Sequence, residues 1–193
     1  MRLNCLQYFQ IARIYRFITM ASVSSNNAKK LIQIDVSADT VCPWCFVGKK
    51  NLDKAIASSQ DKYTFEIKWH PYMLNPSAPK EGVVKKEYYL NKFGPRAAQM
   101  EARMTEIFKG LGMDYDTSGL TAFLVDTAKK VGVEGAAEFL EDPNNGLNEV
   151  NEDLKKYSAH INGVPHFVIN GKYQLSGGQP PESFLRSFEA AAK

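Results

Sequence analysis

The sequence predicts an α/β fold in which a block of helices separates two parts that contain the strands. Three observations support this prediction. Residues 31–37 and 63–69 alternate between apolar and polar side chains, as strands do, and a helical pattern lies between them. Residues 81–142 have a helical pattern. Residues 166–176 form two short alternating runs around an Asn-Gly dipeptide, which is the strongest short-range hairpin motif.

Length and composition limit the classes of protein that fit. With 193 residues, the chain is long enough for one well-buried domain that carries an inserted subdomain. Its net charge of +3 comes with no dense stripe of lysine and arginine, so nucleic-acid binding is not predicted. No apolar run is long enough to cross a membrane, and three cysteines are too few for a disulfide framework.

Residues 1–30 differ from the rest of the chain and are predicted to form a flexible N-terminal extension. Residues 1–19 contain arginines but no acidic residue, a composition that is weakly typical of a transit segment. The alternative is an upstream extension before Met20, and we favour it because an ordinary polar lead-in follows. It predicts a cytoplasmic protein, whereas a transit segment would predict a mitochondrial or plastid one. Cys5 has no role that the sequence indicates.

The first strand-containing part, residues 31–75, is predicted to be a strand, a helix and a second strand. The first strand covers residues 31–37 and the helix covers residues 46–60. Residues 63–69 alternate strictly and give the clearest strand pattern in the chain. His70-Pro71 is expected to end this strand. In the first strand, Leu31, Ile34 and Val36 are expected to be partly buried. The apolar positions of the helix are Val47, Leu52 and Ile56. One face of the second strand carries Tyr63, Phe65, Ile67 and Trp69.

A helical block, residues 76–146, separates the two strand-containing parts. Its helices are predicted over residues 82–92, 95–109 and 120–131, with a short helical piece over 134–141. Glycine and proline residues between these runs end one helix before the next begins. The second helix carries an apolar series at helical spacing, which consists of Met100, Met104, Ile107, Phe108 and Leu111.

The second strand-containing part, residues 147–193, is predicted to be a helix, a hairpin and a last helix. The first helix covers residues 147–161 and carries a continuous apolar stripe. The hairpin joins strands over residues 166–170 and 172–176. The last helix begins at Pro180-Pro181. The stripe consists of Leu147, Val150, Leu154, Tyr157 and Ile161, and the last helix is expected to bury Phe184, Leu185 and Phe188.

Cys42 and Cys45 lie where the first strand ends and the first helix begins, with Pro43 and Trp44 between them. A helix N-terminus offers unpaired N–H groups and a partial positive charge, and both stabilise the reactive thiolate. Pro43 fits the first turn because its missing N–H costs nothing there. The pattern predicts a redox dithiol in which Cys42 is the outer, attacking sulfur and Cys45 resolves. We expect the pKa of Cys42 to lie below the free value of about 8.5.

The CxxC motif by itself is also compatible with two alternatives to a redox dithiol. One is a chance pair of buried cysteines. The other is half of a zinc site, but zinc normally takes four ligands. The remaining candidate ligands show no second pair at ligand spacing, so no metal is expected. These candidates are Cys5, His70, His160 and His166.

Residues 163–171, GVPHFVING, resemble the thioredoxin superfamily and specifically its DsbA-like branch. The resemblance implies that the peptide bond between Val164 and Pro165 is cis and faces the CxxC motif across the active site. It also implies that Pro165, which has no N–H, leaves the neighbouring backbone free to pair with an extended substrate. An ordinary trans proline that opens a strand is the alternative.

The resemblance narrows to the FrnE-like DsbA oxidoreductases of bacteria and plants, over most of residues 31–189. It depends on the segments SADTVCPWCFVGKKNL, WHPYMLNP and GVPHFVINGKYQLSGGQPPE. It implies a thioredoxin-like fold with an inserted α-helical subdomain, and thiol–disulfide exchange as the activity. Members of the family have a longer insertion, and residues 120–123 join two parts that the family separates. We therefore expect a shortened isoform or gene model with apolar helix faces left exposed.

Several residues around the dithiol have expected roles. The residues expected to support the active site are Pro43, Trp44, Asp39, Val164 and Pro165, and those expected to bind substrate are Trp44, Val164 and His166. Trp44 is interpreted as a substrate platform, with a plain surface aromatic as the alternative. Asp39 either accepts the proton of Cys45 or caps the helix. His166 points toward the dithiol or away from it, and a plain strand residue is the default. The residues interpreted as structural are His70, His160, Tyr88 and Tyr89.

The leading functional hypothesis is a DsbA-like thiol–disulfide oxidoreductase that acts on a thiol- or disulfide-containing protein or small molecule. Close relatives with serine at the first cysteine position are glutathione-dependent isomerases or kappa-type transferases, so such an enzyme, with glutathione as co-substrate, is the first alternative. Cys42 at that position favours redox chemistry. Chaperone-like binding without catalysis is the second alternative. No other cofactor, nucleic acid or membrane is an expected partner, and the oligomeric state, the substrate and the direction of electron flow are not predicted.

Overall fold

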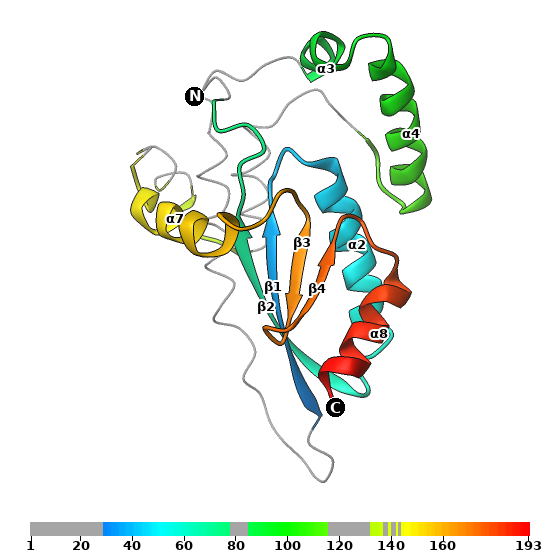
Figure 1. Cartoon of the computed structure of the whole chain (residues 1–193), viewed down its shortest axis with the longest axis vertical. Coiled ribbons are helices and arrows are strands. Elements are labelled where there is room, and N and C mark those ends of the chain that lie inside the picture. Colours follow the sequence, from blue (N-terminus) through cyan, green and yellow to red (C-terminus); the bar gives the residue numbers. More distant parts are fainter. Residues whose placement is uncertain (1–28, 78–84, 116–131, 137–138, 140–141, 143) are drawn as a thin grey trace.

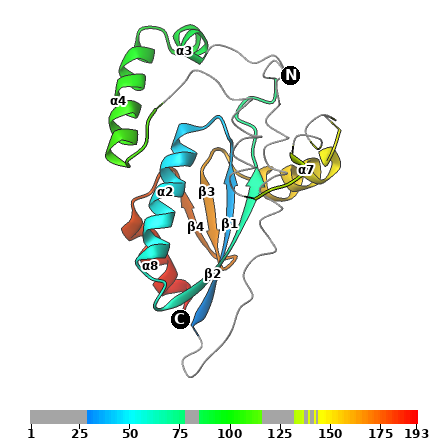
Figure 2. The ribbon, with the colours of Figure 1, turned by 180° about the vertical axis from the view of Figure 1, so that it is seen from behind.

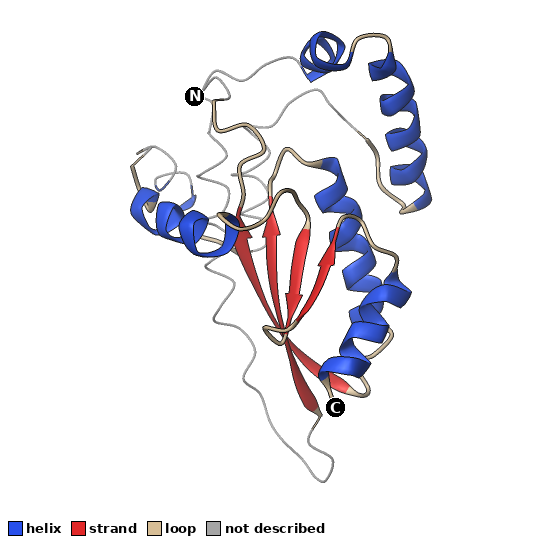
Figure 3. Ribbon diagram, viewed as in Figure 1, coloured by secondary structure: helices blue, strands red, loops and turns tan. Residues whose placement is uncertain are grey.

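A computed structural model describes residues 29–77, 85–115, 132–136, 139, 142 and 144–193. Its elements are β1 (Lys30–Ala38), α2 (Pro43–Ala57), β2 (Tyr63–Pro71), α3 (Lys85–Phe93), α4 (Arg96–Gly110), α7 (Leu147–Asp153), the π-helix η2 (Leu154–Ser158), β3 (His166–Ile169), β4 (Tyr173–Ser176) and α8 (Pro181–Ala191) (Figures 1 and 3). The predicted α/β class is confirmed. Cys5, the extension before residue 29, the helix over 120–131 and the junction at 120–123 lie outside the described residues.

The strands form one four-stranded sheet in the order β2-β1-β3-β4. β1 and β2 are parallel, so the chain must cross from one end of the sheet to the other between them, and α2 makes that crossing. β3 pairs antiparallel with both β1 and β4. The C-terminal end of β1, from which α2 begins, therefore lies beside the start of β3.

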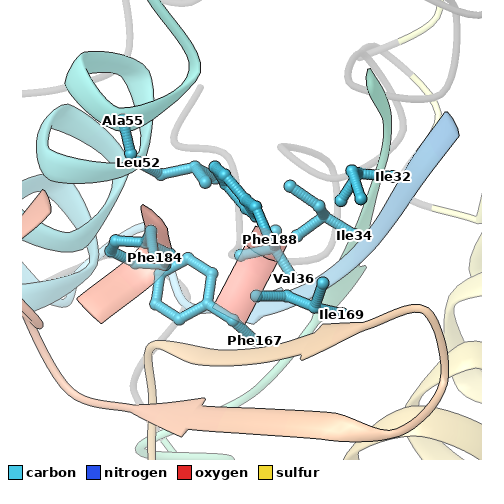
Figure 4. Close-up of a cluster of buried hydrophobic side chains, with 9 residues drawn as sticks. All are labelled: Ile32, Ile34, Val36, Leu52, Ala55, Phe167, Ile169, Phe184 and Phe188. Carbon is cyan, nitrogen blue, oxygen red and sulfur yellow. The ribbon is translucent and has the colours of Figure 1, made fainter. Parts of the chain in front are cut away.

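The hydrophobic core lies between one face of the sheet and the helices α2 and α8, which are neighbours in both views (Figures 1 and 2). Its buried side chains are Ile32, Ile34, Val36, Leu52, Ala55, Phe167, Ile169, Phe184 and Phe188 (Figure 4). Phe167 and Phe184 meet edge to face, with ring centroids 4.9 Å apart. Each large side chain removed from water in this way stabilises the fold by about 1.5–3 kcal/mol.

Two predictions about the first strands are wrong. Leu31 was expected to be partly buried, but it is 51% exposed, because the alternation of β1 places Ile32, Ile34 and Val36 on the helix side. His70-Pro71 was expected to end the second strand, but both residues belong to β2. The reason is that Ser37 and Ala38 of β1 still pair with them.

The other face of the sheet is polar where β1 ends. Ser37 of β1 lies in register with His70 of β2 on one side and with His166 of β3 on the other. His166 in turn lies in register with Ser176 of β4. Side chains alternate along strands, so these four residues share the face that points away from Val36 and Phe167. The π-helix η2 contacts β2 on this face. Ser37, His70 and His166 are all buried.

The helical block stands beyond the N-terminal end of α2, where α3 and α4 form a hairpin of helices (Figure 1). Gly94 between them has a φ of +58°, a conformation that favours glycine. The face of α4 that carries Met104 and Phe108 is buried and packs against Val47 of α2. Met100 belongs to the predicted apolar series but is 44% exposed, so it does not face α2.

The predicted helix over residues 147–161 ends earlier and changes type. α7 ends at Asp153, and η2 adds one wider turn that ends at Ser158, so Ile161 lies beyond the helix. The predicted hairpin is present, with positive φ at both Asn170 and Gly171, which is the geometry of a type I′ turn. Its second strand begins at Tyr173, one residue later than expected. The last helix buries Phe184 and Phe188 fully, and Leu185 is partly buried at the edge of the core.

Candidate active site

The dithiol lies at the start of α2. Cys42 is the residue before the helix, with extended backbone dihedrals (φ −88°, ψ 110°), and Pro43 is the first helical residue. The helix thus begins three residues before the predicted start at 46 and ends at Ala57 rather than at 60. The N–H of Cys45 donates to the carbonyl of Cys42 (3.0 Å), which closes the first turn and brings the two side chains to the same end of the helix.

Val164 and Pro165 lie against this dithiol. The peptide bond between them is cis, in agreement with what the resemblance implies. The carbonyl oxygen of Val164 lies 3.6 Å from the sulfur of Cys42, which donates its S–H to it. Val164 also packs on the cluster formed by Ala38, Cys42 and Cys45. Residues more than a hundred positions apart in the sequence therefore form one site.

Gly48 explains how α2 comes so close to the start of β3. A Cβ atom at this position would lie 2.9 Å from Cγ of Pro165 and 3.0 Å from Cζ of Phe167, which is closer than real Cβ contacts. The absence of a side chain one turn after Cys45 lets the helix rest directly on Pro165. This contact fixes the distance between the dithiol and the loop of Val164.

The two sulfurs differ in electrostatics rather than in exposure. The exposed fractions are 5% for Cys42 and 6% for Cys45, so the predicted distinction between an outer and an inner cysteine does not appear in burial. The pKa of Cys42 is lowered, chiefly because the thiol of Cys45 donates to its thiolate, with further donation from the backbone of Cys45 and Trp44. Burial opposes this shift. The pKa of Cys45 is raised, first by its hydrogen bond to Cys42 and then by burial.

Asp39 is buried just before the dithiol, but it does not cap α2 in the predicted way. One carboxylate oxygen accepts the N–H of Val41 (3.1 Å), and the other accepts the N–H of Leu74 (2.7 Å) in the loop after β2. The carboxylate thus joins the turn before α2 to that loop. Its negative charge raises the pKa of both cysteines, although it is not the largest cause for either.

Trp44 and His166, both predicted to bind substrate, have different surroundings. Trp44 is 37% exposed and packs on Gly178, where a Cβ would lie 2.9 Å from Cε3 of the indole. His166 is buried, and its Nδ1 lies 2.9 Å from the hydroxyl of Ser176. Its pKa is lowered by burial and, to a smaller extent, by His160. Because His166 is on the polar face of the sheet, the structure does not bring it to the dithiol.

Tyr89, interpreted from the sequence as a core residue, is influenced by the charge of the dithiol. Tyr89 of α3 has a raised pKa, first because of burial and next because of the negative charge of Cys42. Tyr115 has its pKa raised to about 12, mainly by burial. Both line a cavity of about 80 Å³ within the helical block, together with Lys86, Leu90, Ala97, Ala98 and Glu101. No local pattern in the sequence indicates that the charge of Cys42 influences a tyrosine more than forty residues later.

Three apolar side chains next to the dithiol in the sequence, Val41, Trp44 and Phe46, are exposed. Val41, directly before Cys42, is 52% exposed, and Phe46, directly after Cys45, is 47% exposed. Trp44 lies between the two cysteines. Among the described residues, no group of three or more histidine, cysteine or acidic side chains is arranged to hold a metal ion. None of the helices within the described ranges has the length and apolar character needed to cross a bilayer.

A dithiol at a helix start, opposite a cis-proline loop on a four-stranded sheet, defines the class of thioredoxin-like proteins. The chain matches the family model described as a DSBA-like thioredoxin domain over residues 33–122 and 88–189. These matches together span most of the chain, which therefore belongs to the DsbA-like thioredoxin domain family. The first match ends at residue 122, inside the predicted junction at residues 120–123.

Two solved structures and one further protein sequence are similar to this chain. The structure is similar to the crystal structure of a probable DsbA oxidoreductase from Streptomyces coelicolor, with a TM-score of 0.69 and 22% identity, covering 83% of this chain and 89% of that chain. It is also similar to oxidised BdbD from Bacillus subtilis, with a TM-score of 0.53 and 16% identity, covering 83% and 87%. The uncharacterized protein YwbO of Bacillus subtilis is 25% identical over 201 residues, covering 84% of this chain and 98% of YwbO. The predicted thioredoxin-like fold is confirmed.

Proposed function

We propose that this protein is a thiol–disulfide oxidoreductase that uses Cys42 and Cys45 as its redox couple, and that it is of the FrnE-like type. The observation that carries the proposal is the position of the dithiol at the start of α2, with the sulfur of Cys42 3.6 Å from the carbonyl oxygen of Val164 in the cis-proline loop. The directions in which the pKa values of the two thiols are shifted support it. The pKa of Cys42 is lowered by donation from Cys45, whereas that of Cys45 is raised by the same contact. Since the thiolate is the nucleophile, this difference assigns the attack to Cys42. Membership of the DsbA-like family supports the same chemistry.

The first step is attack by the Cys42 thiolate on one sulfur of a substrate disulfide. The substrate S–S bond breaks, one substrate thiolate leaves and takes up a proton, and a mixed disulfide forms. The largest cause of the raised pKa of Cys45 was its hydrogen bond to the Cys42 thiolate, and that thiolate no longer exists. Cys45 therefore becomes easier to deprotonate at the moment when it is needed.

In the second step, Cys45 attacks the sulfur of Cys42 and releases the second substrate thiol. The substrate has then gained two electrons and two protons, and the enzyme holds a Cys42–Cys45 disulfide. The same steps in reverse oxidise a dithiol. Asp39 is our candidate to take the proton of Cys45, because its buried carboxylate influences the pKa of both thiols. The exposed Val41, Trp44 and Phe46 are candidates for contact with an apolar part of the substrate.

The test is disulfide exchange with a protein substrate such as insulin, measured for the wild type and three cysteine variants. Cys42→Ser is expected to abolish reduction. Cys45→Ser is expected to accumulate a mixed disulfide with the substrate, because the resolving thiol is missing. Cys5→Ser is the matched control and is expected to retain activity. Full activity of Cys42→Ser would contradict the proposal, and conjugation of glutathione that survives Cys42→Ala would favour a transferase instead.

A further inference from the structure

The polar face of the sheet carries a buried group of side chains that the dithiol chemistry does not use. Nε2 of His70 lies 2.7 Å from a carboxylate oxygen of Asp35. The imidazole stacks on the ring of Tyr157, with centroids 3.4 Å apart and an angle of 18° between the planes. Asp35, His70 and Tyr157 are called the clamp here. The side chain of His70 is only 6% exposed, and its Nδ1 has no hydrogen-bond partner among the described residues.

The clamp joins three elements. Asp35 belongs to β1, His70 to β2 and Tyr157 to η2. Two hydrogen bonds strengthen the same junction: Ser158 donates its hydroxyl to the carbonyl of Pro71, and Ser37 donates to the carbonyl of Tyr157 (3.5 Å). The end of η2 is thus held to the sheet by ring stacking and by hydrogen bonds.

The π-helical turn is what brings these groups together. A π-turn holds more residues than an α-turn and shifts the side chains that follow. Such turns frequently occur at functional sites. In η2 the turn places the ring of Tyr157 over His70 and the hydroxyl of Ser158 on Pro71 in consecutive positions. The sequence pattern alone predicts a regular α-helix at this point.

The loop that follows the clamp leads directly to the dithiol. Residues 159–163 connect η2 to Val164, whose carbonyl accepts the S–H of Cys42. The far end of the loop is held as well, because the N–H of Gly177 donates to the carbonyl of Pro165 (2.8 Å). A short loop held at both ends moves when either end is released.

We propose that the clamp positions the loop that carries Val164 against the sulfur of Cys42. The inference builds on the proposed function, because it assigns positioning residues to the same active site. Asp35 and His70 lie on the face of the sheet opposite to α2, and the dithiol lies at the start of α2. The effect of the clamp on Cys42 therefore passes through the backbone between Tyr157 and Val164.

Release of the loop is expected to change the pKa of Cys42 in one direction. The carbonyl of Val164 accepts the S–H and so favours the neutral thiol, and burial of the sulfur favours it too. Loss of both influences lowers the pKa of Cys42 further and opens the sulfur to reagents. Global unfolding has the opposite signature, because it returns both cysteines to the ordinary pKa of about 8.5 and exposes them equally.

The experiment measures iodoacetamide alkylation as a function of pH, with the modified cysteine identified by mass spectrometry. Tyr157→Leu removes the stacking, and Tyr157→Phe preserves it. For Tyr157→Leu we expect alkylation of Cys42 at pH 7 to be about two- to fivefold faster, the factor that corresponds to an ordinary hydrogen bond, with a lower midpoint. Tyr157→Phe is expected to match the wild type.

Gln33→Leu is the control on the same face of the sheet. It removes a hydrogen bond of 2.8 Å between Gln33 of β1 and Glu66 of β2, which does not involve η2. We expect it to leave the alkylation of Cys42 unchanged. If Tyr157→Leu does not fold, Asp35→Asn supplies the test, since it keeps the shape of the side chain. It is expected to shift the midpoint in the same direction and to speed hydrogen exchange at the amide of Gly177.

An unchanged midpoint in both Tyr157→Leu and Asp35→Asn would overturn the proposal. So would equal alkylation of Cys42 and Cys45 in a folded variant, because that result indicates general loosening rather than a released loop. Disulfide exchange is measured separately on the wild type. If the wild type fails to exchange disulfides while the alkylation shift is observed, the proposed function is wrong and the positioning of the loop stands.

Discussion

At the scale of single residues, the dithiol and the Val164-Pro165 segment are short motifs that can be recognised in the sequence, and only the resemblance to the DsbA-like branch implies that they face each other. Cys42, Cys45, Val164 and Pro165 belong to two short segments, and the sequence places both segments next to a strand. The clamp was not predictable. His70 lies thirty-five residues from Asp35, and its contact with Tyr157 depends on a π-turn that the apolar stripe does not encode.

Asp39 provides a prediction at this scale. Its negative charge raises the pKa of Cys42, so Asp39→Asn is expected to lower that pKa and to make alkylation faster at pH 7. The variant also weakens two hydrogen bonds of a buried carboxylate, which is expected to lower the free energy of unfolding by about 1–3 kcal/mol. A pH series of alkylation rates and a urea titration measure the two effects.

The control for Asp39 is Asp53→Asn, which breaks an exposed pair with Lys49 on α2 (2.7 Å). Surface pairs of this kind contribute little, so the free energy of unfolding is expected to change by less than about 0.5 kcal/mol. If Asp39→Asn raised the pKa of Cys42, the assigned influence of the carboxylate on the thiol would be wrong.

At the scale of elements, the strand and helix types were predictable from periodicity, and the errors concern register and ends. The prediction for Leu31 does not follow the period of two in β1, because Ile32, Ile34 and Val36 share the face toward the helices and Leu31 lies on the other face. The predicted helix over residues 46–60 begins three residues after the observed start of α2, although Pro43 itself is predicted to fit the first turn of a helix.

Gly48→Ala tests the contact between α2 and the start of β3, which positions the dithiol against the loop of Val164. The added Cβ would lie 2.9 Å from Pro165, so α2 and the start of β3 must move apart. We expect a loss of about 1–3 kcal/mol in the free energy of unfolding, together with slower disulfide exchange. Gly110→Ala at the end of α4 is the matched control, since its Cβ would meet nothing within 4 Å. Equal effects of both substitutions on exchange would show that the close approach at Gly48 does not matter.

At the scale of the whole molecule, the helical block was predictable as helices but not as a neighbour of the dithiol. Several faces of α3 and α4 carry apolar residues, and only the packing shows that Met104 and Phe108 are buried while Met100 is exposed. The ring of Phe108 lies 6.4 Å from that of Phe46, directly after Cys45. The block therefore contacts the same turn of α2 that begins with the active site.

Phe108→Ala tests whether the block is docked on α2. Removal of this buried ring is expected to cost about 3–5 kcal/mol, as for other buried phenylalanines, measured by urea unfolding. Met100→Ala on the same helix is the control and is expected to stay within about 0.5 kcal/mol of the wild type, because Met100 is exposed. Similar costs for both variants would contradict the docking of α4 on α2.

We propose that the fold gives the two thiols opposite tasks, with Cys42 as the nucleophile. Alkylation of the reduced wild-type protein across a pH range, with the modified residue identified by mass spectrometry, tests it most directly. Cys42 is expected to react first, with a midpoint below the ordinary cysteine value of about 8.5, and Cys45 is expected to react only at higher pH. A midpoint for Cys42 at or above that value, or earlier reaction of Cys45, would contradict it.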